Sequence, residues 1–143
     1  MIRGYFGSDG WPYLLGIVSL PRLSIRASVV FLVDTGADVT ALAPRDSLRM
    51  GVDFERHFPT GPSGVLEGIG GSAQTYSEEA QIQFLSEDGD LETFARPLTL
   101  LAGTHFMAMP SLLGRDLFDN YRISYCRQLD ELTLESFDLE ESE

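Results

Sequence analysis

The sequence predicts an all-β protein folded as a closed or nearly closed barrel. Short segments rich in β-branched and aromatic residues recur along the chain, turn residues separate them roughly every eight to twelve positions, and one short helix is expected near the C-terminal end. The chain has 143 residues, of which 43% are apolar. This length and composition predict one globular domain at residues 1–129, followed by an acidic strand or tail at residues 130–143.

A β-hairpin is expected first. Residues 13–20 are mostly apolar and residues 25–33 are rich in β-branched and aromatic side chains, so each segment is predicted as a strand. Residues 21–24 join the two strands. The second strand then runs directly into a turn at residues 34–36.

A short strand and a short helix are expected after this turn. Residues 40–42 predict the strand. Pro44 and Asp46 predict the start of a helix that covers residues 47–50 and ends near Gly51.

The middle of the chain predicts a second hairpin and three strands. Residues 59–71 are dense in glycine, and their GIGG sequence is expected at the hairpin tip. Residues 80–84 alternate in polarity, which is typical of a half-buried strand. A tight turn at residues 88–89 then precedes strands predicted at residues 91–95 and 97–101.

The C-terminal part predicts a short helix and two further strands. The helix is expected within residues 115–121, and strands at residues 123–126 and 132–134 are expected to close the fold. From Asp130 on, the chain carries seven acids and little to bury, which indicates a solvated tail.

Composition argues against several classes of function. The chain has 22 acids and 10 bases, a net charge of −12, which disfavours binding to nucleic acid or to an anionic membrane surface. Cys126 is the only cysteine, so an intramolecular disulfide is excluded. Because no apolar run of signal-peptide or membrane-span length occurs, a soluble cytoplasmic protein is expected. No metal and no cofactor are expected.

The most informative segment is residues 31–37, FLVDTGA. An apolar strand carries Asp34 into a turn, which fixes its carboxylate and leaves it accessible. Gly36 permits close approach of a substrate or another backbone, and Thr35 is able to brace the loop by hydrogen bonding. Asp-Thr-Gly is also a common β-turn, so the tripeptide alone leaves a catalytic and a structural interpretation open.

Three segments together resemble a known family. Residues 31–42, FLVDTGADVTAL, resemble the active-site segment of retropepsin-type aspartic peptidases, which include retroviral proteases and bacterial relatives. Residues 67–72, EGIGGS, resemble the tip of their flap hairpin, and residues 112–117, LLGRDL, resemble the segment that opens their C-terminal helix. The resemblance spans roughly residues 13–125 and implies a retropepsin-like barrel with a flap.

The resemblance implies that Asp34, Thr35 and Gly36 form a catalytic loop. It is an established property of aspartic proteases that two carboxylates about 3 Å apart share one proton and act as base and acid together. This chain has a single Asp-Thr-Gly, since the Asp-Gly pairs at residues 9–10 and 88–89 lack the apolar strand and the threonine. The second carboxylate is therefore expected from Asp34 of another copy, in a homodimer.

The flap resemblance implies a lid over an extended peptide substrate. The family often has an aromatic or apolar residue just after the flap glycines, where this chain has Ser72 and Ala73, and that departure bears on substrate preference. The predicted substrate-binding residues are Ala37, Asp38, Val39, Leu66, Gly68, Ile69, Gly70 and Gly71.

The third segment implies support for the catalytic loop. Arg115 is expected to pair with Asp38, because a guanidinium binds a carboxylate through two nitrogens; two unrelated surface charges are the alternative. Leu112, Leu113 and Gly114 are assigned to structural support. Asp116 stands at a helix start and is expected to be a cap or dipole partner.

Other candidate residues carry weaker signals. His57 and His105 have no cluster of ligands at metal-binding spacing, so structural roles are expected. Ser63 and Ser111 lack the context of a serine nucleophile.

The motifs together predict an aspartic endopeptidase that hydrolyses peptide bonds with water held between two Asp34 carboxylates of a homodimer. Acidic to mildly acidic pH is expected to favour hydrolysis, because one proton must remain on the pair. The alternative is a catalytically silent peptide-binding or dimerisation module of the same fold.

Overall fold

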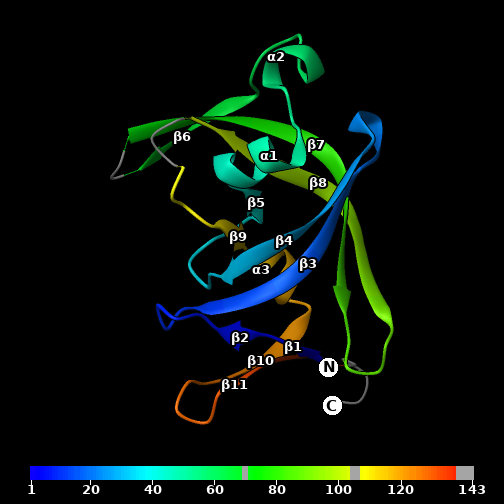
Figure 1. Cartoon of the computed structure of the whole chain (residues 1–143), viewed down its shortest axis with the longest axis vertical. Coiled ribbons are helices and arrows are strands. Elements are labelled where there is room, and N and C mark those ends of the chain that lie inside the picture. Colours follow the sequence, from blue (N-terminus) through cyan, green and yellow to red (C-terminus); the bar gives the residue numbers. More distant parts are fainter. Residues whose placement is uncertain (69–70, 104–106, 138–143) are drawn as a thin grey trace.

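The computed structural model describes residues 1–68, 71–103 and 107–137. The elements in chain order are β1 (Ile2–Arg3), β2 (Tyr5–Phe6), β3 (Pro12–Leu20), the 3-10 helix η1 (Pro21–Leu23), β4 (Ile25–Val33), β5 (Ala41–Leu42), α1 (Pro44–Met50), α2 (Phe54–His57), β6 (Gly64–Gly68), β7 (Gly71–Leu85), β8 (Leu91–Ala102), β9 (Ser111–Leu113), α3 (Arg115–Phe118), β10 (Tyr121–Cys126) and β11 (Glu131–Ser136). Six strands close a barrel in the order β3-β4-β9-β5-β8-β7, with β7 pairing back to β3 (Figure 1). The predicted all-β barrel is confirmed.

Strands β3 and β4 form the hairpin expected at the start of the chain. They pair antiparallel over residues 13–20 and 25–32, and β4 has the bounds predicted from the sequence. Because side chains alternate between the two faces of a strand, Leu14, Val18 and Phe31 are buried inside the barrel while their neighbours point outward. The hairpin thus fixes the strand that leads into the Asp-Thr-Gly turn.

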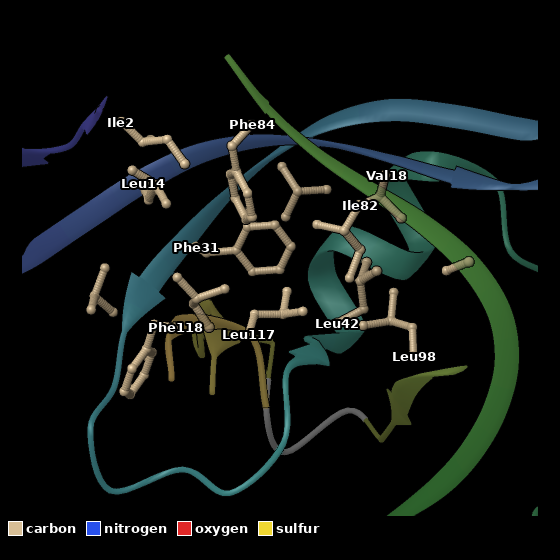
Figure 2. Close-up of a cluster of buried hydrophobic side chains, with 14 of the residues drawn as sticks. Ile2, Leu14, Val18, Phe31, Leu42, Ile82, Phe84, Leu98, Leu117 and Phe118 are labelled. Atoms are coloured by element: carbon tan, nitrogen blue, oxygen red, sulfur yellow. The ribbon is translucent and has the colours of Figure 1, made fainter. Parts of the chain in front are cut away.

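Large apolar side chains fill the barrel (Figure 2). Phe31 and Phe84 meet edge to face with ring centroids 6.3 Å apart. Leu42, Leu98 and Leu117 are fully buried in the same cluster, so β5, β8 and α3 are anchored to it. Truncating a buried phenylalanine of this kind to alanine typically costs about 3–5 kcal/mol of stability.

One continuous strand, β8, replaces the two strands predicted at residues 91–95 and 97–101. It pairs with β7 along its whole length, including Pro97 opposite Glu79. On its other edge, β5 pairs only with Thr99 and Leu100, so that edge has no strand neighbour at the proline. A proline is tolerated at such a position, because its missing N–H interrupts no ladder on the open side.

The last two strands do not close the barrel, contrary to the prediction. β10 and β11 pair with each other and with β1 in a separate three-stranded sheet at the end of the molecule where the chain begins (Figure 1). The barrel is closed instead by residues 17–19 of β3 pairing with residues 81–83 of β7. Strand partners are set by long-range contacts that local residue patterns do not contain.

The prediction of a solvated tail from Asp130 on is wrong for β11. Leu132 and Leu134 are each about 1% exposed and belong to the main apolar cluster. Glu131 and Glu135 are exposed. Because successive side chains of a strand point to opposite faces, β11 can bury its leucines while its acids remain in solvent. Residues 138–143 lie outside the described residues, and the division of the chain after residue 129 stays a prediction.

Short helices cover parts of the barrel. α1 begins at Pro44, earlier than the predicted residues 47–50, and ends at Met50, next to Gly51 as predicted; the φ of Gly51 is 96°, which is left-handed. α2 was not predicted, and α3 ends at Phe118, before the end of the predicted range. In the part of the chain that the structure describes, no helix combines the length and apolar character needed to cross a membrane.

Candidate active site

The Asp-Thr-Gly turn is held against the end of β9. The Asp34 amide donates to the Leu113 carbonyl at 3.1 Å, and the Ala37 amide donates to the Asp34 carbonyl at 3.1 Å. The Gly36 amide donates to Asp34 Oδ1 at 2.9 Å. Asp34 is half-buried, whereas Thr35 and Gly36 are exposed. The turn therefore presents a fixed carboxylate at the surface.

The other carboxylate oxygen of Asp34, Oδ2, accepts no hydrogen bond from any residue that the structure describes. Its neighbour Oδ1 is occupied by the Gly36 amide, which restricts the rotation of the carboxylate. One oxygen is therefore fixed, and the other is available for a substrate, a water molecule or a second protein chain.

Gly114 lies in direct contact with the chain that follows the turn. A Cβ at this position would come within 2.4 Å of the Val39 carbonyl carbon and 2.8 Å of the Thr40 amide nitrogen. Because backbone atoms cannot yield as the end of a side chain can, only glycine fits here. This contact is the physical reason for the glycine in the Leu-Leu-Gly-Arg-Asp sequence.

Two backbone hydrogen bonds and one ion pair brace the loop from α3. The Arg115 amide donates to the Ala37 carbonyl at 2.9 Å, and the Asp116 amide donates to the Asp38 carbonyl at 3.2 Å. The predicted ion pair between the Arg115 guanidinium and the Asp38 carboxylate is present. The side chains are 49% and 79% exposed, so this pair contributes at most about 1 kcal/mol. The backbone bonds are the firmer part of the brace.

Asp116 lies in the first turn of α3, which agrees with the expected dipole partner, but it is not the helix cap that was the other alternative. The residue at the N-cap of α3 is Gly114, and no side chain caps that end. Asp116 Oδ1 instead accepts from the Thr40 amide at 3.0 Å and from the Thr40 hydroxyl at 2.7 Å. Since Thr40 comes from the segment after the turn, Asp116 joins α3 to the candidate catalytic loop.

Thr40 and Arg96 complete this network, and the sequence analysis assigned a role to neither. Thr40 is buried, and its hydroxyl also accepts the Gly114 amide at 3.0 Å. Arg96 donates from Nη1 to the Asp116 carbonyl at 2.8 Å and lies 3.6 Å from Asp116 Oδ2. Thr40 falls inside the segment 31–42 that carries the family resemblance, whereas no sequence pattern marks Arg96.

Solved protease structures resemble this architecture. The crystal structure of a retropepsin-like aspartic protease from Rickettsia conorii matches with a TM-score of 0.55 and 20% sequence identity, covering 94% of this chain and 88% of that chain. The chain has a retropepsin-like fold. EIAV protease complexed with the inhibitor HBY-793 matches with a TM-score of 0.48 and 16% identity, over 80% of this chain and 90% of that chain. No protein-family model and no curated protein matches the sequence.

In this retropepsin-like fold, the glycine-rich segment forms the predicted hairpin of β6 and β7. The strands pair antiparallel as far as Gly68 opposite Gly71. Leu66 is exposed on this hairpin, and Val39 is exposed on the loop beyond Asp34. Ile69 and Gly70, which were predicted to bind substrate, lie outside the described residues.

A buried polar cluster supports the other side of the retropepsin-like barrel. The Ser111 hydroxyl donates to Asp46 Oδ2 at 2.6 Å and accepts the Ala43 amide at 2.9 Å. Arg49 pairs with Asp46 at 3.1 Å. Ser111 therefore joins α1 to β9.

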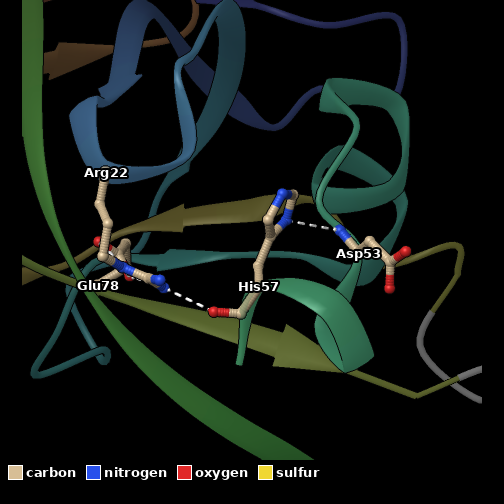
Figure 3. Close-up of polar contacts among 4 residues, drawn as sticks. All are labelled: Arg22, Asp53, His57 and Glu78. Atoms are coloured by element: carbon tan, nitrogen blue, oxygen red, sulfur yellow. Dashed lines mark hydrogen bonds and ion pairs between the residues drawn. The ribbon is translucent and has the colours of Figure 1, made fainter. Parts of the chain in front are cut away.

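His57 also has structural contacts (Figure 3). Its Nδ1 accepts the Asp53 amide at 3.0 Å, and its carbonyl accepts from Arg22 Nη2 at 2.9 Å. Arg22 makes a two-nitrogen contact with the buried Glu78 of β7, so η1, α2 and β7 are joined. His105 lies outside the described residues, and the structure contains no group of three or more potential metal ligands within the ranges it describes.

Proposed function

We propose that this chain is one half of a homodimeric aspartic endopeptidase. The observation that carries the proposal is the state of Asp34: its backbone and Oδ1 are fixed by hydrogen bonds, and Oδ2 has no described partner. A single carboxylate cannot hold a water as base and protonate the substrate as acid in the same step. A second copy of Asp34 across a two-fold axis supplies the missing group.

The reaction requires only these two carboxylates and water. One Asp34 takes a proton from the water while the water oxygen bonds to the scissile carbonyl carbon. The Asp34 of the second copy gives a proton to the carbonyl oxygen. The resulting tetrahedral species then collapses, the carbon–nitrogen bond breaks, and the amine leaves with a proton. No covalent bond to the enzyme forms.

The network behind the loop supports this role because the two carboxylates must be placed accurately. Gly114 packs on the Val39 backbone, and Thr40 is bonded to both Asp116 and the Gly114 amide. These contacts hold the loop without using the Asp34 side chain. Positioning by rigid elements is what a catalytic pair about 3 Å apart demands.

The β6–β7 hairpin is the proposed flap. A peptide substrate would lie extended beneath it and pair with its backbone as an added strand. Leu66 and Val39 are the described residues that we propose to contact substrate side chains, and both are exposed apolar groups. Gly68, Ile69, Gly70 and Gly71 are proposed to reach over the peptide.

The decisive test of activity is hydrolysis of denatured casein by the parent protein and by Asp34→Asn. Cleavage by the parent and none by the variant is expected. Asp88→Asn is the matched control, because it makes the same change at an exposed residue of the Asp-Gly turn between β7 and β8. An inactive parent that still binds peptides would replace this proposal with the silent-module alternative.

The shared pair is tested by mixing subunits. When half of the parent protein is replaced by Asp34→Asn at constant total concentration, random mixed dimers should leave about one quarter of the activity. Independent active sites would leave about one half. A linear loss of activity with parent fraction would therefore contradict a site made from two chains, even if the chain is a peptidase.

A further inference from the structure

Two short elements, η1 and α2, lie against β7 at the root of the β6–β7 hairpin (Figure 1). η1 connects β3 to β4, and α2 leads through residues 58–63 into β6. β8 pairs with β7 as far as Gln74, so the part of the hairpin without a third strand starts just beyond this junction. A contact that holds η1 and α2 on β7 therefore acts on both strands of the hairpin.

Glu78 is an acid on the buried face of β7. Because side chains alternate along a strand, Glu78 shares this face with Tyr76 and Ala80, and all three residues are buried. The side chain of Glu78 is only 5% exposed. Moving a carboxylate from water into such a row is strongly unfavourable unless the charge is paired and hydrogen-bonded. The position of Glu78 in the barrel wall therefore depends on its partner.

Arg22 of η1 is that partner. Its Nε donates to Glu78 Oε1 at 2.8 Å, and its Nη2 donates to the same oxygen at 2.6 Å. Within the described residues, every hydrogen bond to the Glu78 side chain comes from Arg22. A planar guanidinium has several donors in fixed directions, so this contact restrains the orientation of the two elements as well as balancing charge.

The same guanidinium also holds α2 (Figure 3). Nη2 of Arg22 donates to the carbonyl of His57, the last residue of α2, at 2.9 Å. The guanidinium carbon lies 5.1 Å from the centroid of the Phe58 ring, within the range of cation–π attraction. Phe58 packs in turn on Tyr76 of β7, with ring centroids 4.8 Å apart. One arginine thus joins η1, α2 and β7.

We infer that Arg22 is a positioning residue for the proposed flap: by holding Glu78 and α2 together, it fixes the root of the β6–β7 hairpin, and the hairpin bends only beyond Gln74. The effect on substrate rests on the function proposed above, whereas the effect on the hairpin root does not. When the root is loosened, a smaller fraction of molecules holds the hairpin over a peptide, and the apparent affinity for substrate falls with that fraction. Arg22 acts on substrate only through the hairpin.

The test compares variants at opposite ends of β7. Arg22→Gln removes the clamp and leaves Glu78 without its charged partner, whereas Arg22→Gln combined with Glu78→Gln removes both charges. The double variant separates position from stability, because it leaves no unpaired charge in the barrel wall. Arg3→Gln combined with Glu87→Gln is the matched control, since this exposed ion pair joins β1 to the turn that follows β7.

Hydrogen exchange followed by NMR reports on the hairpin root and requires no activity. In both Arg22 variants, we expect the amides of residues 74–78 to exchange at least about tenfold faster, while those of residues 81–85 in the same strand change less than about twofold. The amides of Asp34 and Thr40 and all amides of the control should keep their rates. Equal acceleration throughout the chain, or none at residues 74–78, would overturn the inference.

Steady-state kinetics report on the effect on substrate. The substrate is a quenched fluorescent peptide that contains a casein site cleaved by the parent protein. The double variant should raise KM at least about fivefold and keep kcat within about twofold, because the catalytic loop is intact and only the hairpin is held less often. A variant that is merely less folded would lose kcat per mole of protein at an unchanged KM, and that result would overturn the inference.

The outcomes also separate the inference from the proposed activity. Faster exchange at residues 74–78 in the Arg22 variants, with no hydrolysis by the parent, would uphold Arg22 as the clamp of the hairpin root and overturn the peptidase. Hydrolysis by the parent with the same KM in both Arg22 variants would uphold the peptidase and overturn the inference.

Discussion

The loop around Asp34 and the β6–β7 hairpin are both expected to touch substrate, but they are held in different ways. Two segments converge on the loop: β9 bonds to Asp34, and α3 bonds to residues 37–38 through its backbone and to Thr40 through the Asp116 carboxylate. Beyond Gln74, the hairpin end has only the two strands paired with each other, because β8 reaches no further than that residue. Two-stranded ribbons are marginal alone. The carboxylate is thus held by more contacts than the end of the hairpin, which fits the proposed flap.

The largest difference is expected from glycine substitutions in the two regions. Gly114→Ala should cost about 3 kcal/mol or more of unfolding free energy, because its Cβ would meet the backbone of Val39 at 2.4 Å. Gly64→Ala in the hairpin is the matched control, since its Cβ would meet only the Thr75 hydroxyl, at 3.0 Å. Urea unfolding measures both variants. Equal losses would show that the loop is no more tightly held than the hairpin.

Hydrogen exchange should separate the regions without any substitution. The amides of Asp34, Thr40 and Gly114 are bonded inside the brace, and we expect them to exchange at least about a hundredfold more slowly than the amides of residues 65–67. Exchange followed by NMR in the full chain tests this order. Similar protection in both regions would contradict the proposal that the hairpin opens.

Removing the Thr40 hydroxyl should weaken the brace by an intermediate amount. Thr40→Val leaves the buried Gly114 amide without its acceptor and removes one donor to Asp116, at a cost of about 2 kcal/mol. Thr75→Val on the hairpin should stay within about 0.5 kcal/mol. Thermal unfolding compares the pair. A neutral Thr40→Val would show that the backbone contacts alone hold the loop.

The smallest effect is expected at the exposed ion pair. Asp38→Asn removes the charge that pairs with Arg115 but keeps the Asp38 carbonyl that accepts the Asp116 amide. The unfolding free energy should fall by less than about 1 kcal/mol, and the difference from the parent should shrink in high salt. A larger, salt-independent loss would place this pair among the main supports of the loop.

Local sequence patterns were sufficient to predict those elements whose structure depends mainly on neighbouring residues. The strand at residues 25–33 follows from its β-branched and aromatic residues, the end of α1 from Gly51, and the turn at Asp34 from Asp-Thr-Gly. α2 was missed because its four residues depend on the packing of Phe54 and Phe58 against Tyr76 of β7. Such a short helix has little stability of its own.

Part of the candidate site was also predicted, because its residues stand in short, recognisable sequence segments. Asp34, Gly114 and the pair of Arg115 with Asp38 stand in segments that resemble the family, and the structure brings those segments together. The partner of Asp116 could not be predicted, because a carboxylate can accept hydrogen bonds equally well from the amides of a helix N-terminus and from Thr40. Only the packing of α3 against the loop decides between them.

The sequence by itself determined several of the strands, the turn at Asp34 and a single Asp-Thr-Gly, because residue preferences and turn chemistry act over a few neighbouring residues. The tertiary structure alone decided that β7 closes the barrel on β3 and that β11 joins β1. These outcomes depend on contacts between residues far apart in the chain, where the gain from burial outweighs local preference.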